Sequence, residues 1–485
     1  MLTLTRMLAA TALVAGCSSS GGTVAAPSPT PSLGLSSSPS PAPSPAPSPT
    51  PVQGQSLSGP APAARSAALR LSTDWTTYGG SGARRSAAAG PNPSSPAVAW
   101  RSALDGRVYA SPLVVHGRVI AATENGSLYA LDGRNGHVVW RRHLAPPVRG
   151  STLPCGNIDP LGITGTPVYD PATRLVFAVA TQRGPMHVLY GVDAATGAVR
   201  LARRVDVAGM QPATHLQRAA LLLSGRTVYV AYGGNYGDCG QYKGRVVAVP
   251  TSGRGALRSF AVPTAREAGI WAASGPALLP GGDLLVTTGN GAASGGRWDR
   301  SDSVLRLSPT LALKDGFAPR QWARENSVDA DLGSMGPLLL PGDRRAIASG
   351  KGGNTFLVDV NRLGGVGGQK ASLSGCRAFG GGAVLGSSVF LPCSGGLLQV
   401  VVRGDRLVRG WRASSSVVGS PLVVGTTVWS VQQDGTLYGL DAANGHRRAR
   451  LAVGAATRFA KPAVSGNMLL IPTKAGITAV RLAYS

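Results

Sequence analysis

The stretch Asn125-Gly-Ser-Leu-Tyr-Ala-Leu-Asp132 recurs almost unchanged as Asp434-Gly-Thr-Leu-Tyr-Gly-Leu-Asp441. Each copy is followed by a Gly-His pair, Gly136-His137 and Gly445-His446. Each copy is also preceded by two apolar runs around a Gly-containing turn, which is the pattern of a β-hairpin. Self-similarity of this kind indicates a repeat architecture, and it decides the fold before any single residue does.

Weaker copies of the same pattern fill the rest of the chain. The residue that corresponds to Tyr129 in the other units is Tyr190, Val247, Leu305, Phe356, Leu398, Tyr438 and Thr478. The chain therefore contains eight units, each with two apolar strands, a third strand around Leu-Tyr-x-Leu-Asp and a weaker fourth. Radial repetition of four antiparallel strands predicts the blades of a propeller. The alternative, a solenoid, fits less well because its repeats are shorter and more even.

The two ends of the repeat region complete each other. The last unit, Phe459 to Tyr484, ends after its third strand, whereas the strand around Trp100 precedes the first unit. A blade shared by both ends closes the ring and leaves no free sheet edge. We predict an all-β, eight-bladed β-propeller with four-stranded antiparallel blades over residues 71–485, closed by the N- and C-terminal strands.

The chain is strongly basic, with 47 Lys and Arg against 22 Asp and Glu and a formal net charge of +25, nearly all of it arginine. Such a charge attracts anionic surfaces, or it reflects the arginine bias of a GC-rich genome. No basic cluster with interleaved aromatic residues stands out, so we expect no nucleic-acid site. The six histidines form no Ser-His-Asp or metal-ligand motif. We expect a monomer.

The N-terminus predicts export. An apolar run from Met7 to Ala15 leads to Leu13-Val-Ala-Gly-Cys17, which resembles the lipobox of bacterial lipoproteins. The resemblance implies a signal peptide over residues 1–17 and lipidation of Cys17, which anchors the protein to the outer face of the cell membrane. The alternative is an ordinary signal peptide with a chance Cys. Residues 18–70 are rich in Pro, Ser and Ala, which predicts a disordered, extended tether.

The repeats resemble the pyrroloquinoline quinone (PQQ) repeat family, whose pattern is a hairpin, then Gly-x-Leu-Tyr-Ala-Leu-Asp, then a strand ending in Trp. The likeness covers about Asp74 to Ser485 and includes the opening Trp75-x-x-Tyr78-Gly-Gly. One branch of the family consists of dehydrogenases that bind PQQ and Ca²⁺ in the axial funnel. Another consists of cofactor-free lipoproteins that bind other proteins. Composition and tether also resemble lipoproteins of high-GC Gram-positive bacteria.

Four residues match positions at which the dehydrogenase branch holds its cofactor. The resemblance implies that Trp271 stacks under PQQ, Asn290 ligates calcium, Asp329 is the catalytic base and Lys351 contacts PQQ oxygens. Trp271 and Asp329 precede the first strand of their units, whereas Asn290 and Lys351 follow the second. Both kinds of loop open on one face of a propeller, so we expect the four side chains to converge there.

The resemblance is incomplete at the metal. The calcium-ligating Glu of the family is absent from the loop Tyr232–Gly240, where Asp238 is the only carboxylate. Asn290, Asp329 and Asp238 are thus the weak candidate ligands of a cation that prefers six or more oxygens. No Cys-x-x-Cys-His haem motif and no adjacent cysteine pair are present.

Each candidate also has a structural explanation. Trp271 could plug the funnel, and Asn290, between glycines, could be a left-handed turn residue. Asp329 and Asp331 could fix turn amides, and Lys351 could form an internal ion pair.

Apart from Cys17, the chain has four cysteines, which in an exported protein suggests two disulfides with three possible pairings. On the repeat map, Cys376 precedes the first strand of its unit and Cys393 follows the second. Cys155 and Cys239 are expected in equivalent loops of neighbouring units. We predict the pairs Cys155–Cys239 and Cys376–Cys393.

Two functions remain open. We favour a non-catalytic, cofactor-free binding or scaffold module for an envelope protein or glycan. The alternative is a PQQ- and calcium-dependent alcohol or polyol dehydrogenase with Asp329 as the base.

Overall fold

The computed structural model describes residues 73–90 and 92–484. The chain divides into two compact units, residues 1–65 and 66–485. The first unit lies outside the described residues, as do Cys17, the signal peptide over 1–17 and the tether over 18–70, so these stay predictions. Within the described part, no helix has the length and apolar character needed to cross a membrane.

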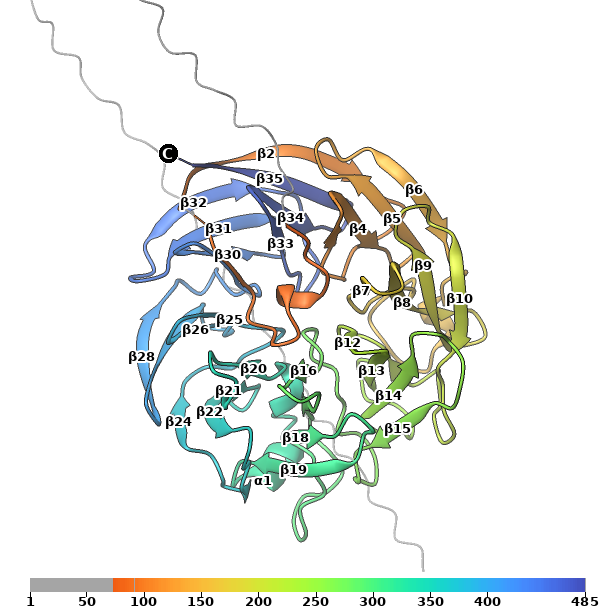
Figure 1. Ribbon diagram of the computed structural model, residues 1–485. Helices are drawn as coiled ribbons and strands as arrows, with labels where there is room; N and C mark the ends of the chain where they lie inside the picture. The colour runs from red at the N-terminus through yellow and green to blue at the C-terminus, as the bar shows by residue number, and fades with distance from the viewer. Residues whose placement is uncertain (1–72, 91, 485) are drawn as a thin grey trace, which may run out of the picture. The chain divides into compact units, whose positions relative to one another are not determined.

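Eight antiparallel sheets form the eight blades of a propeller, as predicted, and follow one another around the ring in chain order (Figure 1). Blade 1 consists of β3 (Leu113–Val115), β4 (Arg118–Ala122), β5 (Ser127–Asp132) and β6 (Val138–His143), and blade 2 of β7 (Val168–Asp170), β8 (Leu175–Gln182), β9 (Met186–Asp193) and β10 (Val199–Arg204). Blade 3 consists of β12 (Leu222–Ser224), β13 (Thr227–Gly234), β14 (Arg245–Pro250) and β15 (Arg258–Ala261), and blade 4 of β16 (Ala277–Leu278), β17 (Leu284–Thr287), β18 (Val304–Leu307) and β19 (Leu313–Ala318).

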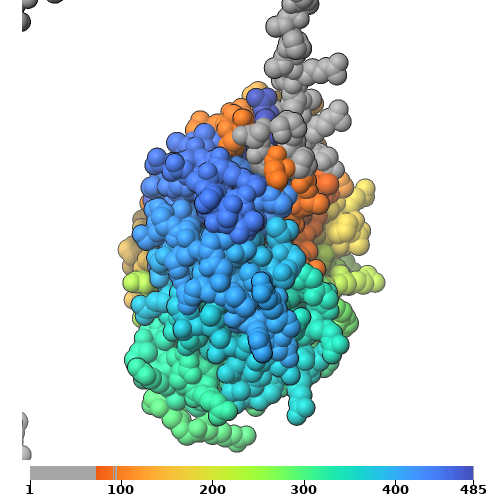
Figure 2. Space-filling view, turned by 90° about the vertical axis from the view of Figure 1, so that its left-hand side faces the viewer, coloured from red at the N-terminus to blue at the C-terminus, as the bar shows by residue number. Residues whose placement is uncertain are grey.

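Blade 5 consists of β20 (Leu338–Leu339), β21 (Arg345–Ser349), β22 (Asn354–Asp359) and β24 (Ala371–Ser374), and blade 6 of β25 (Ala383–Leu385), β26 (Ser388–Leu391), β27 (Leu398–Arg403) and β28 (Arg406–Arg412). Blade 7 consists of β29 (Leu422–Val424), β30 (Thr427–Val431), β31 (Thr436–Asp441) and β32 (Arg447–Ala452), and blade 8 of β33 (Ala463–Ser465), β34 (Met468–Pro472), β35 (Gly476–Tyr484) and β2 (Pro93–Ala103). Figure 2 shows the ring from its side, where blades of the C-terminal half succeed one another.

A few short elements supplement the blades. β11 (His215–Leu216), β23 (Gly365–Val366) and β1 (Ala87–Ala88) add to blades 3, 4 and 7, and α1 (Trp322–Ser327) precedes blade 5. The hairpin turns show why the first two strands pair. In blade 1 the turn residues His116 and Gly117 both have positive φ, 49° and 76°, which is the geometry of a tight hairpin turn.

Blade 8 closes the ring as predicted from the two chain ends. β2, from the N-terminal end, pairs antiparallel with β35, from the C-terminal end, over nine registered residue pairs from Pro93–Tyr484 to Ala103–Gly476. The fourth strand of this blade is thus supplied by the start of the repeat region. This pairing joins the two ends of the repeat region within one blade.

Tryptophans on fourth strands join neighbouring blades. The indole Nε1 of Trp100, Trp140 and Trp411 donates to a carbonyl in the third-to-fourth-strand turn of the next blade, at 3.1, 3.1 and 3.0 Å. The same ring covers a glycine of that turn. At Gly445 an added Cβ would lie 2.6 Å from the Trp411 ring, and φ there is +76°. The repeat therefore keeps Gly and Trp because the two meet between blades.

Residues 73–88, here called the central strap, run through the middle of the ring (orange in Figure 1). Strap carbonyls accept hydrogen bonds from one residue on or beside the first strand in each of six blades: Val114, Tyr169, Leu278, Val384, Val423 and Ser465. The guanidinium of Arg84 donates to Leu221 O at 2.9 Å, and that of Arg85 to Leu340 O at 3.0 Å. These contacts include all eight blades, so the strap ties the inner strands together.

Candidate functional site

The five candidate residues Trp271, Asn290, Asp329, Lys351 and Asp238 line one cavity of about 370 Å³. Trp271 lies before β16 and Asp329 before β20, whereas Asn290 follows β17 and Lys351 follows β21. The loops that lead into first strands and those that follow second strands thus open into a common funnel, as the repeat map predicts. The structure therefore brings the candidates together.

Lys351 holds two carboxylates. Its Nζ lies 2.7 Å from Oδ1 of Asp329 and 2.5 Å from Oδ2 of Asp331. The Asp331 side chain is 5% exposed, whereas that of Asp329 is 64% exposed. Burial raises the pKa of Asp331 to about 6 even though Lys351 opposes that shift. Burial alone would lower the pKa of Lys351, but Asp331 and Asp329 together raise it, so the ammonium stays charged.

Asp331 also connects blades 4 and 5. Its Oδ1 accepts the backbone N–H of Asn290 at 2.8 Å, while Oδ2 faces Lys351. A Cβ at Gly289 would lie 2.0 Å from that Oδ1, so only glycine fits there. Both oxygens of Asp331 are thus engaged in fixing loops. This supports the structural explanation of Asp331, which fixes a turn amide, and that of Lys351, which forms an internal ion pair.

The backbone conformation of Asn290 differs from the expectation. Asn290 is absent from the residues with positive φ, so the interpretation as a left-handed turn residue is wrong for it. Asp329 instead has φ of +52°. The turn between β17 and β18 is held by the Asp331 side chain, so Asn290 does not need the left-handed conformation to close it.

Trp271 lies between two parts of the funnel. Its ring centroid is 6.2 Å from that of Phe459 and 5.8 Å from Nζ of Lys351. On its other side the side chain covers Gly233, where an added Cβ would lie 2.6 Å from the Cβ of Trp271. The indole is half-buried and lines the cavity. It is therefore an aromatic wall of the funnel.

The donor set does not fit a calcium site. Asp238 accepts the hydroxyl of Tyr242 at 2.5 Å, and Asp329 and Asp331 are paired with Lys351. Within residues 73–90 and 92–484, no group of three or more His, Cys, Asp or Glu is arranged to hold a metal ion. Ca²⁺ requires six or more oxygens. The residue that a PQQ oxygen would meet, Lys351, is already paired with two aspartates.

Sequence reasoning missed a second group of funnel residues, here called the cation–aromatic cluster: Tyr109, Arg218, Phe379, Arg458 and Phe459. A signal for them was present. Tyr109, Arg218, Phe379 and Phe459 each stand four residues before the first strand of a blade, at β3, β12, β25 and β33. This equivalent position is near the axis in each of these blades, so a residue there reaches the funnel.

The structure forms both predicted disulfides, Cys155–Cys239 and Cys376–Cys393. The expectation of equivalent loops for the first pair is wrong. Cys155 lies in the connection between blades 1 and 2, whereas Cys239 lies between β13 and β14 of blade 3. The two sulfurs meet because both loops open on the funnel side, and Gly237 packs on the Cys155 side chain.

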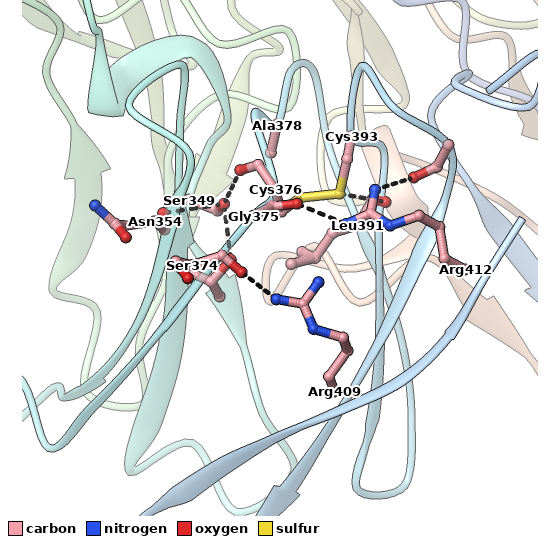
Figure 3. The surroundings of a disulfide bond; sticks show 12 residues. Ser349, Asn354, Ser374, Gly375, Cys376, Ala378, Leu391, Cys393, Arg409 and Arg412 are labelled. Carbon is pink, nitrogen blue, oxygen red and sulfur yellow. Dashed lines mark hydrogen bonds between the residues drawn. A yellow bond between two sulfur atoms is a disulfide. The ribbon is translucent and has the colours of Figure 1, made fainter.

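The second disulfide spans the hairpin of blade 6 (Figure 3). Arg412 donates to Gly375 O at 2.5 Å and to Gly396 O at 3.2 Å, and Arg409 donates to Ser374 O at 2.7 Å. Two arginines of β28 thus brace the loops that carry Cys376 and Cys393. These arginines serve the scaffold of the funnel wall.

Comparison with known proteins agrees with this architecture. The family model described as outer membrane protein assembly factor BamB matches residues 81–205. The match to this family model shows that the repeats are PQQ-like, as the sequence pattern indicated. No curated protein matches the sequence.

Solved structures of both branches share the fold. Quinohemoprotein alcohol dehydrogenase ADHIIG of Pseudomonas putida HK5 has 12% identity and a TM-score of 0.65, covering 85% of this chain and 80% of that one. The quinohemoprotein alcohol dehydrogenase of Comamonas testosteroni has 15% identity and a TM-score of 0.65, covering 86% and 82%. BamB of Moraxella catarrhalis has 16% identity and a TM-score of 0.55, covering 81% and 99%. Because the sequence identities are this low, these similarities show a shared fold and nothing about function.

Proposed function

We propose that the protein is a non-catalytic binding module that offers its funnel to an envelope protein or a glycan. One observation carries this proposal. Lys351, Asp329 and Asp331 form a closed set of ion pairs, and Asp331 also holds the Asn290 amide. Lys351, which the family resemblance assigns to the cofactor, thus pairs with Asp331 and helps to fix the loops of blades 4 and 5.

The chemistry of the site agrees with binding. A general base needs a carboxylate within reach of the substrate proton and a pKa suited to accept it. Asp329 is instead paired through Oδ1 with the Lys351 ammonium at 2.7 Å, so one of its oxygens is already engaged. A concave cavity with aromatic walls and a few polar groups is the usual form of a small-ligand site.

The N-terminal sequence suggests where the binding module would act. Cys17 would carry the lipid, and residues 18–70 would hold the propeller away from the membrane. In that arrangement the funnel is free to meet a partner in the envelope. The protein would act as a monomer, without nucleic acid and without a bound cofactor.

A quinoprotein alcohol or polyol dehydrogenase is the second candidate. The observation in its favour is that Trp271, Asn290, Asp329, Lys351 and Asp238 line one cavity in a fold shared with such enzymes. In that case Asp329 would leave Lys351 to act as the base, and PQQ would supply the oxidising power.

An activity assay separates the two candidates. Full-length protein incubated with PQQ and Ca²⁺ is tested for oxidation of primary alcohols and polyols with an artificial electron-accepting dye. We expect no turnover above that of a control without protein. Asp405→Ala, an exposed aspartate in the β27–β28 turn, is the matched control for Asp329→Ala. Turnover that disappears in Asp329→Ala and persists in Asp405→Ala would overturn the proposal.

A further inference from the structure

We propose that the centre of the funnel binds a sugar that carries an anionic group, with the anion held between Arg218 and Arg458. This inference rests on the proposed binding function and names the chemical class of the ligand. The anionic group can be a carboxylate or a phosphate, because a guanidinium binds both in the same bidentate manner.

Two arginines converge on one aromatic ring. The guanidinium carbon of Arg218 lies 4.6 Å from the centroid of Phe459, and that of Arg458 lies 4.9 Å from it. Phe379 stacks on Phe459 at 6.1 Å, and Arg458 also lies 5.3 Å from Phe379. The aromatic rings hold both guanidinium groups at the wall of the cavity and limit their conformational freedom.

Neither arginine has a carboxylate partner within the part of the chain that the structure describes. Arg218 donates from Nη2 to the carbonyl of Arg458 at 3.3 Å, and its buried Nε has no hydrogen-bond partner among the described residues. The two positive charges are therefore close together and uncompensated. An anion placed between them would remove their repulsion and satisfy the open N–H donors.

The surrounding charges leave this anion-binding end positive. Burial lowers the pKa of Arg218 to about 10, and Arg458 acts in the same direction, so Arg218 remains charged at neutral pH. Glu124 is an acid whose charge acts on Arg218, and burial raises the pKa of Glu124 to about 7. Asp329 and Asp331 are held by Lys351 beyond the Trp271 ring, and Asp238 accepts from Tyr242.

The rest of the cavity suits a sugar. Trp271 offers an aromatic face, on which the C–H face of a pyranose can pack. Planar polar groups that can pair with hydroxyls line the same space, namely Asn157, Asn235, Asn290 and the exposed carboxylate of Asp329. A volume of about 370 Å³ fits a terminal saccharide better than a folded protein surface, which would need a broad and flat contact.

Equilibrium binding tests the proposal with matched sugars. Methyl glucuronide, glucose 6-phosphate and methyl glucoside are titrated into the full-length protein, followed by saturation-transfer NMR and by Trp fluorescence. We expect saturable binding of at least one anionic sugar, and at least tenfold weaker binding of methyl glucoside. The first two sugars distinguish a carboxylate from a phosphate as the anion.

Variants locate the site. Arg458→Gln, at an exposed position that does not threaten folding, is expected to weaken binding of the anionic sugar about tenfold, since it removes a charge-assisted contact. Arg218→Gln should act in the same direction. Arg450→Gln, an exposed arginine of the outer strand β32, is the matched control and should leave binding unchanged.

The outcomes separate the two proposals. Equal binding of charged and uncharged sugars, no binding of any of them, or no effect of Arg458→Gln would overturn the anionic-sugar site. Equally tight binding of acetyl-Ala-Ala would show that a carboxylate is recognised without the sugar, and would overturn it too. None of these results would support the dehydrogenase function. The binding function itself fails only if the dehydrogenase assay gives turnover that depends on Asp329.

Discussion

The Nζ of Lys351 lies 2.5 Å from Oδ2 of Asp331, and this ion pair joins the loop after β21 to the loop before β20. The other carboxylate oxygen of Asp331 accepts the backbone N–H of Asn290, which links this loop to blade 4. The pair is buried on the Asp331 side and lies beside the aromatic wall formed by Trp271. It links loops of blades 4 and 5, and the first prediction follows from it.

Lys351→Met should destabilise the protein in a pH-dependent manner. It leaves Asp331 buried and unpaired, which lowers the free energy of unfolding by about 3 kcal/mol at pH 8. The pKa of Asp331 is raised to about 6 with Lys351 in place and should rise further without it. At pH 5 the carboxyl is then protonated and the loss should shrink. Urea unfolding at both pH values measures this, with Lys351→Met/Asp331→Asn as the control expected to recover most of the loss. An equal loss at pH 5 and pH 8 would contradict the prediction.

Glu124→Gln should stabilise the protein at high pH. Burial raises the pKa of Glu124 to about 7 from its ordinary 4.5, so the folded state binds the proton more tightly than the unfolded state does. The associated stability is full below pH 4.5 and is lost as the pH rises through about 7. Replacing the carboxyl by an amide removes that loss, by about 2 kcal/mol at pH 8.

Thermal and urea unfolding of Glu124→Gln and wild type at pH 5 and pH 8 test this sign. The variant should be more stable at pH 8 and should approach wild type at pH 5. Glu124 accepts the Gly162 N–H at 2.8 Å, a bond that the Gln carbonyl can keep. A variant that is less stable than wild type at pH 8 would show that Glu124 is ionised and well paired.

Arg84→Met should weaken the whole ring rather than one blade. The side chain is 1% exposed and donates to Thr77 Oγ1, Tyr78 O, Leu221 O and Pro276 O. Losing these bonds leaves buried carbonyls unpaired, each worth about 1 to 3 kcal/mol. We expect a loss of at least about 3 kcal/mol in the free energy of unfolding. Arg134→Met, which removes an exposed surface arginine, should change stability by less than about 0.5 kcal/mol.

Trp411→Ala should destabilise the contact between blades 6 and 7 by about 3 kcal/mol, because it removes an aromatic ring packed on Gly445. Trp411→Phe keeps most of the ring and loses the bond from Nε1 to Ala442 O, so it should cost about 1 kcal/mol. Chemical denaturation of the two variants gives the comparison. A Phe variant as unstable as the Ala variant would assign the effect to the hydrogen bond alone.

Much of the scaffold follows from the sequence because its repeats are local. The Leu-Tyr-x-Leu-Asp pattern around Tyr129 and Tyr438 marks third strands that the structure contains as β5 and β31. The same repeat map brings the candidate residues into one cavity and pairs the cysteines correctly. It does so because each position in a blade has a fixed place relative to the axis.

Other features could not be predicted because they are not repeated. The central strap contacts the blades through its own carbonyls and through Arg84 and Arg85, and such contacts leave no pattern in a single chain. The engagement of Lys351 by two aspartates depends on side-chain distances. Four members of the cation–aromatic cluster, unlike these contacts, do stand at a repeated position four residues before a first strand, but residues as different as Tyr109 and Arg218 occupy it.

The most direct test of the central claim is an equilibrium titration of the full-length protein with PQQ, with and without Ca²⁺, followed by Trp fluorescence. Comparison with the Trp271→Phe variant shows which part of the fluorescence change comes from the tryptophan in the funnel. Because Lys351 is already neutralised and the carboxylates do not form a calcium site, we predict no saturable quenching at tens of micromolar PQQ and no effect of Ca²⁺. Saturable, calcium-dependent quenching that is lost in Trp271→Phe would contradict the account and would make the funnel a cofactor site.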